Sequence, residues 1–500
     1  MTVEQNLAYL LIPFTDFSVF ALLVLGVILG IWVGAIPGLS ITMAVSLLIS
    51  FTFSWELNNA VALIIGVHVG GMYGGAITAI LINIPGAPAA IVTGLDGYPL
   101  AQKGEAGNAI GLCTVMSVLT GLIGVVALAV FAPPLGKLAL KFAPRDFFLL
   151  AIMGLLLIAS IGGANPVKGA ITGGLGILFS FVGMDMATAE LRYTYDSVNL
   201  MGGLHYVVAM IGLFGVTEAM TQFRDMSVRS VKQDLRRVVP RWKTFVDMLP
   251  LAIRSSIVGV GIGALPGTGG DVAALIAYDQ AKRTVKNPTA PFGQGAIEGV
   301  VAPESANKGS LGGVYIPMLT LGIPGDGVTA IVIGALYIHG LKPGPMLMIE
   351  TPHLFWMIVS LMTLGFLAQG LIGLVSIKPF AKIIETPKRI VLPIIVILSV
   401  VGSYSIQNSL FDVFLMMGFG VFGYFLRMYG FATGPLILGM ILGPILEVNF
   451  RRSLEMTGDS LLQFLVSLVA NPISAVLVFA IAFSIFSQTT TYRRLRGLEA

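Results

Sequence analysis

Two short stretches of the chain combine the residue types that a binding site inside a bilayer requires. Each is an apolar segment that starts among glycines and breaks at Ile-Pro-Gly, at residues 84–86 and again at residues 323–325. Proline removes a backbone donor and glycine tolerates a left-handed turn, so a helix ends there. The first backbone N–H groups of the next helix have no partner within that helix and carry partial positive charge. They can therefore receive a carboxylate group.

Residues around these breaks could complete such a site. Small residues let a substrate reach the backbone, and hydroxyl and amide side chains could add hydrogen bonds or, with free carbonyls, bind Na⁺. The substrate-binding residues that we expect are Gly38, Asn83, Pro85, Gly86, Ala87, Gly267, Thr268, Ser305, Asn307, Pro324, Gly325, Asp326 and Thr329. Na⁺ could lie near Asn83, Thr268 and Asn307. For any single residue, close helix packing is an equally good interpretation.

Ionisable residues near the breaks are further candidates, because charge inside a membrane is costly and often functional. Glu304 and Lys308 are four residues apart, so a helical ion pair is the plain alternative. His68 lies close to the first break and could relay protons, although a packing role is the more common one. The others in this neighbourhood are Asp271, Glu298 and His339, with Lys103 and Lys342 at equivalent positions that we interpret as loops.

No pattern in the sequence indicates catalysis. No histidine pair has metal-ligand spacing, no Ser, His and Asp follow the order of a catalytic triad, and no glycine-rich loop would cradle phosphate. We therefore expect that the chain is not an enzyme and that it has no catalytic residues, no cofactor and no firm metal site. A coupling ion, Na⁺ or H⁺, is expected instead.

The composition places the chain in a membrane. Hydrophobic residues make up 56 % and charged residues 11 %, and the mean hydropathy is +0.91. Soluble domains are roughly a quarter charged. The formal net charge of +4 is too small to suggest a nucleic-acid partner, and one cysteine, Cys113, excludes an intrachain disulfide.

The breaks come in two matched pairs. Gly-Ala-Ile-Pro-Gly at residues 34–38 corresponds to Gly-Ala-Leu-Pro-Gly at residues 263–267, an offset of 229 positions. The two Ile-Pro-Gly breaks are offset by 239 positions, with aligned glycines upstream. This correspondence predicts an internal duplication. Broken helices at matching places in two halves indicate a transporter binding site.

We therefore predict an all-α polytopic membrane protein with broken or re-entrant helices and roughly 10–14 spans. The two homologous halves are expected to be inverted repeats. The first half is assigned to residues 1–221 and the second, with the C-terminal spans, to residues 250–500. Residues 222–249 form a basic linker, which the positive-inside rule places in the cytoplasm.

Several long blocks resemble the large membrane subunit of the tripartite tricarboxylate transporter family, TctA. The blocks are GAIPGLS, GGMYGGAITAILINIPGAPAAIVTGLDGYPLAQKGEAG, GALPGTGG, GAIEGVVAPESAN and IPMLTLGIPGDGVTA. The resemblance implies a permease of the bacterial inner membrane, partnered by a small four-span membrane subunit and a periplasmic solute-binding protein. It implies uptake of carboxylates such as citrate, tartrate or aromatic dicarboxylates, driven by an ion gradient rather than by ATP.

The chain departs from the family pattern after Asn307. The family usually has a second asparagine and alanines there, whereas this chain has Lys308, Gly309 and Ser310. A substrate-facing Lys308 would favour more highly charged anions, and a partner-facing Lys308 would have little effect.

The expected function is secondary uptake of tricarboxylates or related carboxylates, as the large subunit of a binding-protein-dependent system. The alternatives are a membrane scaffold subunit without transport of its own, a membrane-embedded enzyme, or a channel. A scaffold would not need matched broken helices in both halves, and a channel would need a continuous polar lining.

Overall fold

The computed structural model describes residues 9–36, 39–83, 87–161, 166–185, 188–224, 240, 242–383 and 388–487 of the chain. Within these residues the regular structure is helical, apart from one antiparallel hairpin of β1 (Gly183–Met184) and β2 (Leu191–Arg192). The prediction of an all-α fold is confirmed.

The helices fall into two series, one before and one after the central basic segment. The first series is α2 (Ile12–Thr15), α3 (Phe17–Gly34), α4 (Ile41–Thr52), α5 (Leu57–Ile82), α6 (Ala90–Gln102), α7 (Ala106–Ala139), α8 (Pro144–Ile161), α9 (Pro166–Ser180), α10 (Val198–Met201), α11 (Tyr206–Met210), the π-helix η1 (Ile211–Val216) and α12 (Thr217–Arg224). The second series is α13 (Trp242–Gly263), α14 (Gly269–Thr284), α15 (Glu298–Leu321), α16 (Gly327–Ile338), α17 (Leu347–Glu350), α18 (Pro352–Ile383), α19 (Lys388–Gln407), α20 (Leu410–Met428), α21 (Gly434–Glu455), α22 (Leu461–Ala470) and α23 (Pro472–Ser487).

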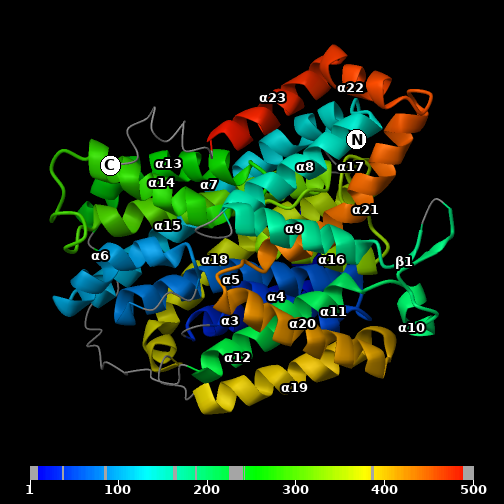
Figure 1. The fold of residues 1–500 in the computed structure, drawn as a ribbon. Helices are drawn as coiled ribbons and strands as arrows, with labels where there is room; N and C mark the ends of the chain where they lie inside the picture. The colour runs from blue at the N-terminus through cyan, green and yellow to red at the C-terminus, as the bar shows by residue number, and fades with distance from the viewer. Residues whose placement is uncertain are drawn as a thin grey trace.

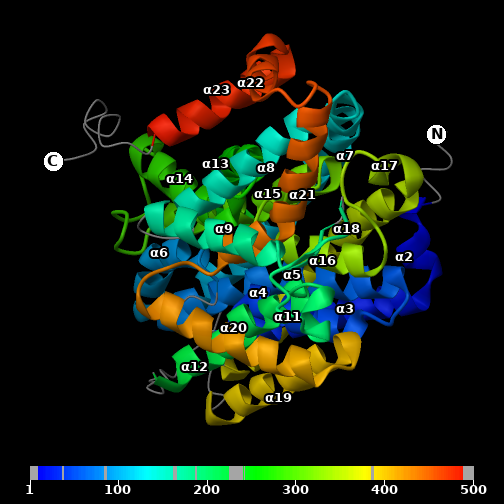
Figure 2. The same cartoon turned by 45° about the vertical axis from the view of Figure 1, so that its right-hand side comes forward.

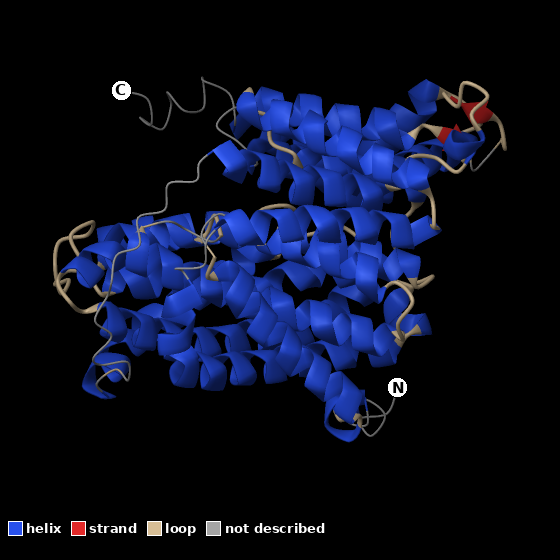
Figure 3. Cartoon of the chain, turned by 90° about the horizontal axis from the view of Figure 1, so that it is seen from below, coloured by secondary structure: helices blue, strands red, loops and turns tan. Residues whose placement is uncertain are grey.

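The helices are those of a polytopic membrane protein. In the part of the chain that the structure describes, nine helices are long and apolar enough to cross a bilayer, and the pair α22–α23, bent by 93°, would make a tenth. Most helices run along one common direction (Figure 1), and the loop between α14 and α15 lies at the opposite end from the β1–β2 hairpin (Figures 1 and 3). In Figure 2, α22 and α23 lie outside the bundle that contains α5 and α15. The inverted orientation of the halves stays a prediction.

The second series repeats the order of the first. The helices α3 and α4, then α5 and α6, are each separated by a Pro-Gly break, and the long α7 follows. The helices α13 and α14, then α15 and α16, are separated by the equivalent breaks, and the long α18 comes later. Both copies therefore place two broken elements ahead of one long helix.

Equivalent helices make equivalent contacts. The pair α3 and α5 packs closely, as does the pair α13 and α15. Across the halves the contacts are exchanged, because α6 and α7 pack on α15 while α16 and α18 pack on α5. The helices α5 and α15 are consequently enclosed, and almost all of their residues are buried.

Glycine residues allow α3 to pack closely on α5 and α13 to pack closely on α15. A Cβ atom on Gly70 of α5 would collide with the carbonyl oxygen of Val27 in α3. At the equivalent place in the second half, a Cβ atom on Gly309 would lie 2.5 Å from the carbonyl oxygen of Ser256 in α13. Small residues let the helix backbones touch, as in other membrane bundles.

The left-handed residues at the ends of α5 and α15 lie just before the Ile-Pro-Gly motifs, and Gly325 of the second motif does not have a positive φ. The helix α5 ends at Asn83 with φ 56°, and α15 ends at Gly322 with φ 72°. Between α13 and α14, Gly267 and Gly269 also have positive φ. Asparagine and glycine tolerate this conformation better than other residues, so the chain can reverse here.

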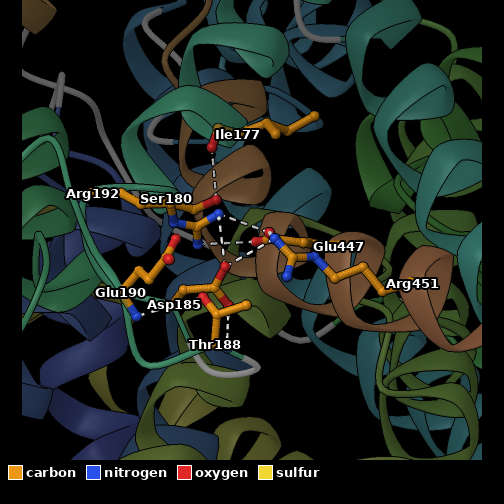
Figure 4. Close-up of polar contacts among 8 residues, drawn as sticks. All are labelled: Ile177, Ser180, Asp185, Thr188, Glu190, Arg192, Glu447 and Arg451. Carbon is orange, nitrogen blue, oxygen red and sulfur yellow. Dashed lines mark hydrogen bonds and ion pairs between the residues drawn. The ribbon is translucent and has the colours of Figure 1, made fainter.

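An ion network ties the hairpin to α21 (Figure 4). Both terminal guanidinium nitrogens of Arg192 donate to Glu447, at 2.7 and 3.2 Å. Nη2 of Arg451 lies 2.8 Å from Asp185 and 2.7 Å from Glu447. The hydrogen bond to Glu447 raises the pKa of Arg192 above its usual range. The guanidinium therefore stays charged, and the base of the hairpin is fixed.

The predicted linker, residues 222–249, is only partly a connection. The helix α12 ends at Arg224, and α13 already begins at Trp242. Residues 225–239 and 241 lie outside the described residues.

Candidate functional site

A cavity of about 610 Å³ lies where the broken elements meet. Its walls come from the starts of α4, α14 and α16, from the segment before α6, from the interiors of α5 and α15, and from the segment that joins α20 to α21. The two halves thus share one site at the interface between them, the arrangement that the matched breaks predict.

The two halves face this cavity with equivalent positions. The offsets of 229 and 239 positions relate a lining residue of the first half to a lining residue of the second. The pairs are Ser40 and Gly269, Ile41 and Gly270, Thr42 and Asp271, His68 and Asn307, Ala87 and Asp326, Pro88 and Gly327, and Ala89 and Val328. The duplicated backbone is therefore the scaffold of the site, and the differences within each pair supply its chemistry.

Asp326 organises the wall at the start of α16. Its Oδ1 accepts hydrogen bonds from the backbone N–H and the hydroxyl of Thr329, both at 2.7 Å, in a capping box. Its Oδ2 lies 3.8 Å from Nε2 of His68, and Nδ1 of His68 lies 3.2 Å from the hydroxyl of Tyr315. One oxygen of Asp326 is thus committed to the helix and the other faces His68.

The first turn of α14 gathers three polar side chains. Asp271 belongs to this turn, lines the cavity and accepts a hydrogen bond from the backbone N–H of Ala89. A Cβ atom on Gly269 would lie 3.1 Å from Cβ of Asp326, and a Cβ atom on Gly270 would collide with Oδ1 of Asn307. Asn307 is 1 % exposed, and neither atom of its amide has a hydrogen-bond partner among the described residues.

The helix starts of the first half carry no acid. Ser40 caps α4 through a hydrogen bond from the N–H of Met43 to its hydroxyl, and α6 begins after Ala89 without a side-chain cap. Neither α4 nor α6 has an acidic residue in its first turn. These turns therefore supply no carboxylate of their own, but Asp271 of α14 accepts a hydrogen bond from the backbone N–H of Ala89 at the start of α6. At the start of α4, the partial positive charge has no carboxylate in its own turn.

A buried ion pair lies on α15 but does not line the cavity. Nζ of Lys308 is 3.4 Å from Oε2 of Glu304, both side chains are fully buried, and the hydroxyl of Thr93 donates a 2.7 Å hydrogen bond to the other oxygen of Glu304. This is the helical ion pair expected from the spacing. Lys308 is thus buried and ion-paired, and it lies neither on the cavity wall nor on an exposed surface.

The arginine on the cavity wall also has a carboxylate partner. Nη1 of Arg427 lies 2.5 Å from Oε2 of Glu218 in α12. Lys103 and Lys342 are exposed, and Nζ of Lys103 donates to the carbonyl of Gln294 at 2.7 Å, so both are loop residues as expected. Among the described residues, no three His, Cys, Asp or Glu side chains gather as metal ligands.

The structure brings together part of the expected binding set. Those that line the cavity are Ala87, Gly267, Thr268, Asn307 and Asp326. Ser305, Pro324, Gly325 and Thr329 are buried near it without lining it, and Asn83 is exposed at the end of α5. Gly38, Pro85 and Gly86 lie outside the described residues. Thr268 and Asn307 share the cavity, but Asn83, the third residue of the expected Na⁺ group, does not line it.

The expected substrate-binding set omits several lining residues. Asp271 and His68 were named only as ionisable candidates near the breaks, and the offset that relates the halves would have selected them together with Thr42. The wall that includes Phe214, Phe431 and Leu438 gave no signal, because those residues belong to ordinary apolar helices and a connecting segment.

Comparison with known proteins identifies the family to which this chain is similar. Residues 20–438 match the tripartite tricarboxylate transporter TctA family. The chain is 37 % identical over 456 residues to an uncharacterized 52.8 kDa protein in the TAR-I ttuC' 3' region of Agrobacterium vitis, a match that covers 91 % of this chain and 89 % of that relative. An uncharacterized protein in the TAR-II ttuC' 3' region of the same organism is 41 % identical over 217 residues, which is 43 % of this chain and 88 % of that relative. No solved structure matches the chain.

Proposed function

Because the chain belongs to the tripartite tricarboxylate transporter TctA family, we propose that it is a permease subunit that takes up a di- or tricarboxylate. The family belongs to tripartite systems with a binding protein and a small membrane subunit. In the proposal, a periplasmic solute-binding protein delivers the carboxylate, and the small subunit assists in the bacterial inner membrane. The uptake is secondary and is driven by a gradient of Na⁺ or H⁺.

The observation that carries the proposal is the contrast between the two walls of the cavity. The first-half wall is the part of the cavity formed by Ser40, Ile41, Thr42, Ala87, Pro88 and Ala89. The first turns of α4 and α6 contain no acidic residue, and Ala87 has a small side chain. A helix start with free N–H groups favours an anion. The substrate carboxylates therefore bind on this wall, with hydroxyls of Ser40 and Thr42 as further hydrogen-bond donors.

The distribution of basic residues supports an orientation. The loop that follows α14 contains Lys286, and α14 itself ends with Lys282 and Arg283. By the positive-inside rule this end faces the cytoplasm. The β1–β2 hairpin, at the opposite end in Figures 1 and 3, then faces the side from which a binding protein arrives.

Transport requires that the cavity opens alternately to each side of the membrane, so one part of the protein must move against another. The glycine contacts of α3 with α5 and of α13 with α15 hold each broken unit together. In the proposed cycle, these units move as bodies against the longer helices and expose the cavity alternately to each side.

Uptake by proteoliposomes tests the function. The vesicles contain this chain and its small subunit, the matching binding protein is added outside, and a panel of radiolabelled carboxylates is offered under separate Na⁺ and pH gradients. The proposal expects uptake of at least one carboxylate that needs both the binding protein and one gradient. Absence of uptake under every gradient, from protein that is correctly folded, would favour a scaffold subunit instead.

A further inference from the structure

The charges around the cavity do not suit an anion by themselves. Arg427 is paired with Glu218, and the buried Lys308 is paired with Glu304. Asp271 and Asp326 remain, and they are close enough to interact electrostatically. Protonation of His68, the other ionisable group beside Asp326, would neutralise only one of the two carboxylates. A substrate carboxylate entering this cavity therefore meets uncompensated negative charge on the second-half wall.

We propose that Asp271, Asp326 and Asn307 bind an alkali cation, Na⁺, on this wall. The proposal rests on the proposed carboxylate transport, because the bound cation offsets the negative charge that would otherwise repel the substrate. It assigns the two walls of one cavity different tasks. The first-half wall binds the anion, and the second-half wall binds the cation.

The free oxygens of the three side chains form a suitable donor set. Na⁺ is a hard cation that prefers carboxylate and carbonyl oxygens, and transporters bind it beside broken helices. Oδ2 of Asp326 is not used by the capping box, and the carboxylate of Asp271 lines the cavity and accepts a hydrogen bond from the backbone N–H of Ala89. Oδ1 of Asn307 comes so close to the first turn of α14 that a side chain at position 270 would have to displace the Asn307 amide.

The acids Asp271 and Asp326 alone would not indicate a cation site, and the unpartnered amide of Asn307 is the observation that does. Acidic residues at the starts of α14 and α16 can be explained without a ligand, because negative charge at a helix N-terminus is stabilised by the helix dipole. A buried amide without a hydrogen-bond partner has a desolvation cost, and a bound cation would offset the part of that cost that belongs to Oδ1. In the first half the equivalent positions hold Thr42, His68 and Ala87, which lack carboxylates, so the cation site belongs to one half only.

Binding of ²²Na⁺ to the purified full chain in detergent tests the site directly. Wild-type protein should bind Na⁺ saturably, and Asp271→Asn and Asp326→Asn should each weaken binding by about tenfold or more, since each removes a charged ligand. Asparagine is as good a helix cap as aspartate, so Asp326→Asn preserves the start of α16. Gly270→Ala, which displaces the Asn307 amide and leaves both carboxylates, should also weaken binding.

Asp279→Asn is the matched control. Asp279 is exposed on the same helix α14 and pairs only with Arg283 in the described structure, so its loss should leave Na⁺ binding unchanged. Equal ²²Na⁺ binding by wild type and by the double variant D271N/D326N would overturn the proposed site.

A second measurement distinguishes a failure of the Na⁺ site from a failure of the proposed permease function. Affinity for a transported carboxylate is measured in Na⁺ and in choline at two pH values. The proposal expects Na⁺ to raise that affinity in wild type and not in the double variant. Carboxylate binding that responds only to pH would overturn the Na⁺ assignment while the permease function stands. Saturable Na⁺ binding that the variants abolish, without carboxylate binding, would support the site while the permease function fails.

Discussion

At the scale of single residues, the pairs related by the internal offset are the most informative feature. Thr42 faces the cavity where its counterpart is Asp271, and Ala87 faces it where its counterpart is Asp326. The same backbone positions are thus neutral in one half and acidic in the other. A duplicated scaffold can in this way hold two ligands of opposite charge.

Thr42 should contribute directly to carboxylate affinity. Replacement Thr42→Val removes a hydroxyl from the cavity wall and keeps its shape, so we expect KM for uptake to rise by about tenfold, the value of a hydrogen bond to a charged group. Thr42→Ser should restore most of the affinity. Thr363→Val is the control, because the hydroxyl of Thr363 bonds to a carbonyl of its own helix α18. An unchanged KM in Thr42→Val would remove this hydroxyl from the binding site.

At the scale of elements, the contacts between helices depend on particular glycines rather than on glycine content. In α13, a Cβ atom on Gly259 would collide with the carbonyl of Ala306 in α15. A Cβ atom on Gly261, in the same helix, would meet nothing within 4 Å. A substitution at Gly259 therefore tests the close packing of α13 on α15, whereas a substitution at Gly261 tests only the helix propensity.

Alanine at these two positions should have opposite effects. Gly259→Ala should lower stability by about 1–3 kcal/mol, because it forces α13 away from α15. Gly261→Ala should leave the stability unchanged or raise it by up to about 1 kcal/mol, because alanine is the better helix former. Thermal unfolding of both variants in detergent measures the difference. Equal melting temperatures would show that α13 and α15 are not in backbone contact.

The β1–β2 hairpin is an element held by charge. Arg192→Ala leaves Glu447 and Asp185 with one arginine between them, and an incompletely paired charge costs about 1–3 kcal/mol. We expect the hairpin to loosen and to be cleaved faster in limited proteolysis. Glu190→Ala, on an exposed side chain of the same hairpin, is the control. Equal cleavage rates in the two variants would mean that the ion network does not fix the hairpin.

At the scale of the whole molecule, the sequence predicted the class of fold. Composition indicated a membrane protein, and described residues that flank the four glycine-proline breaks line one cavity. Local chemistry determined both results, since helix breaks and hydropathy are properties of short segments.

The rest depended on tertiary contacts. Lys308 drew attention as a departure from the family pattern, but its partner Glu304 and its burial within α15 remove it from the cavity. Asn83 has the right chemistry but lies exposed at the end of α5, outside the cavity. The wall beside Phe431 comes from a segment far away in the sequence, and no local pattern relates it to the breaks.

The central claim is that a substrate carboxylate binds on the first-half wall of the shared cavity. An experimental structure of the chain with a bound bromine-labelled carboxylate would test it most directly. The account predicts ligand density against the helix start of α4, beside Ser40, Thr42 and Ala87. Density against Asp271 and Asp326 without contact to the start of α4, or outside this cavity, would contradict it.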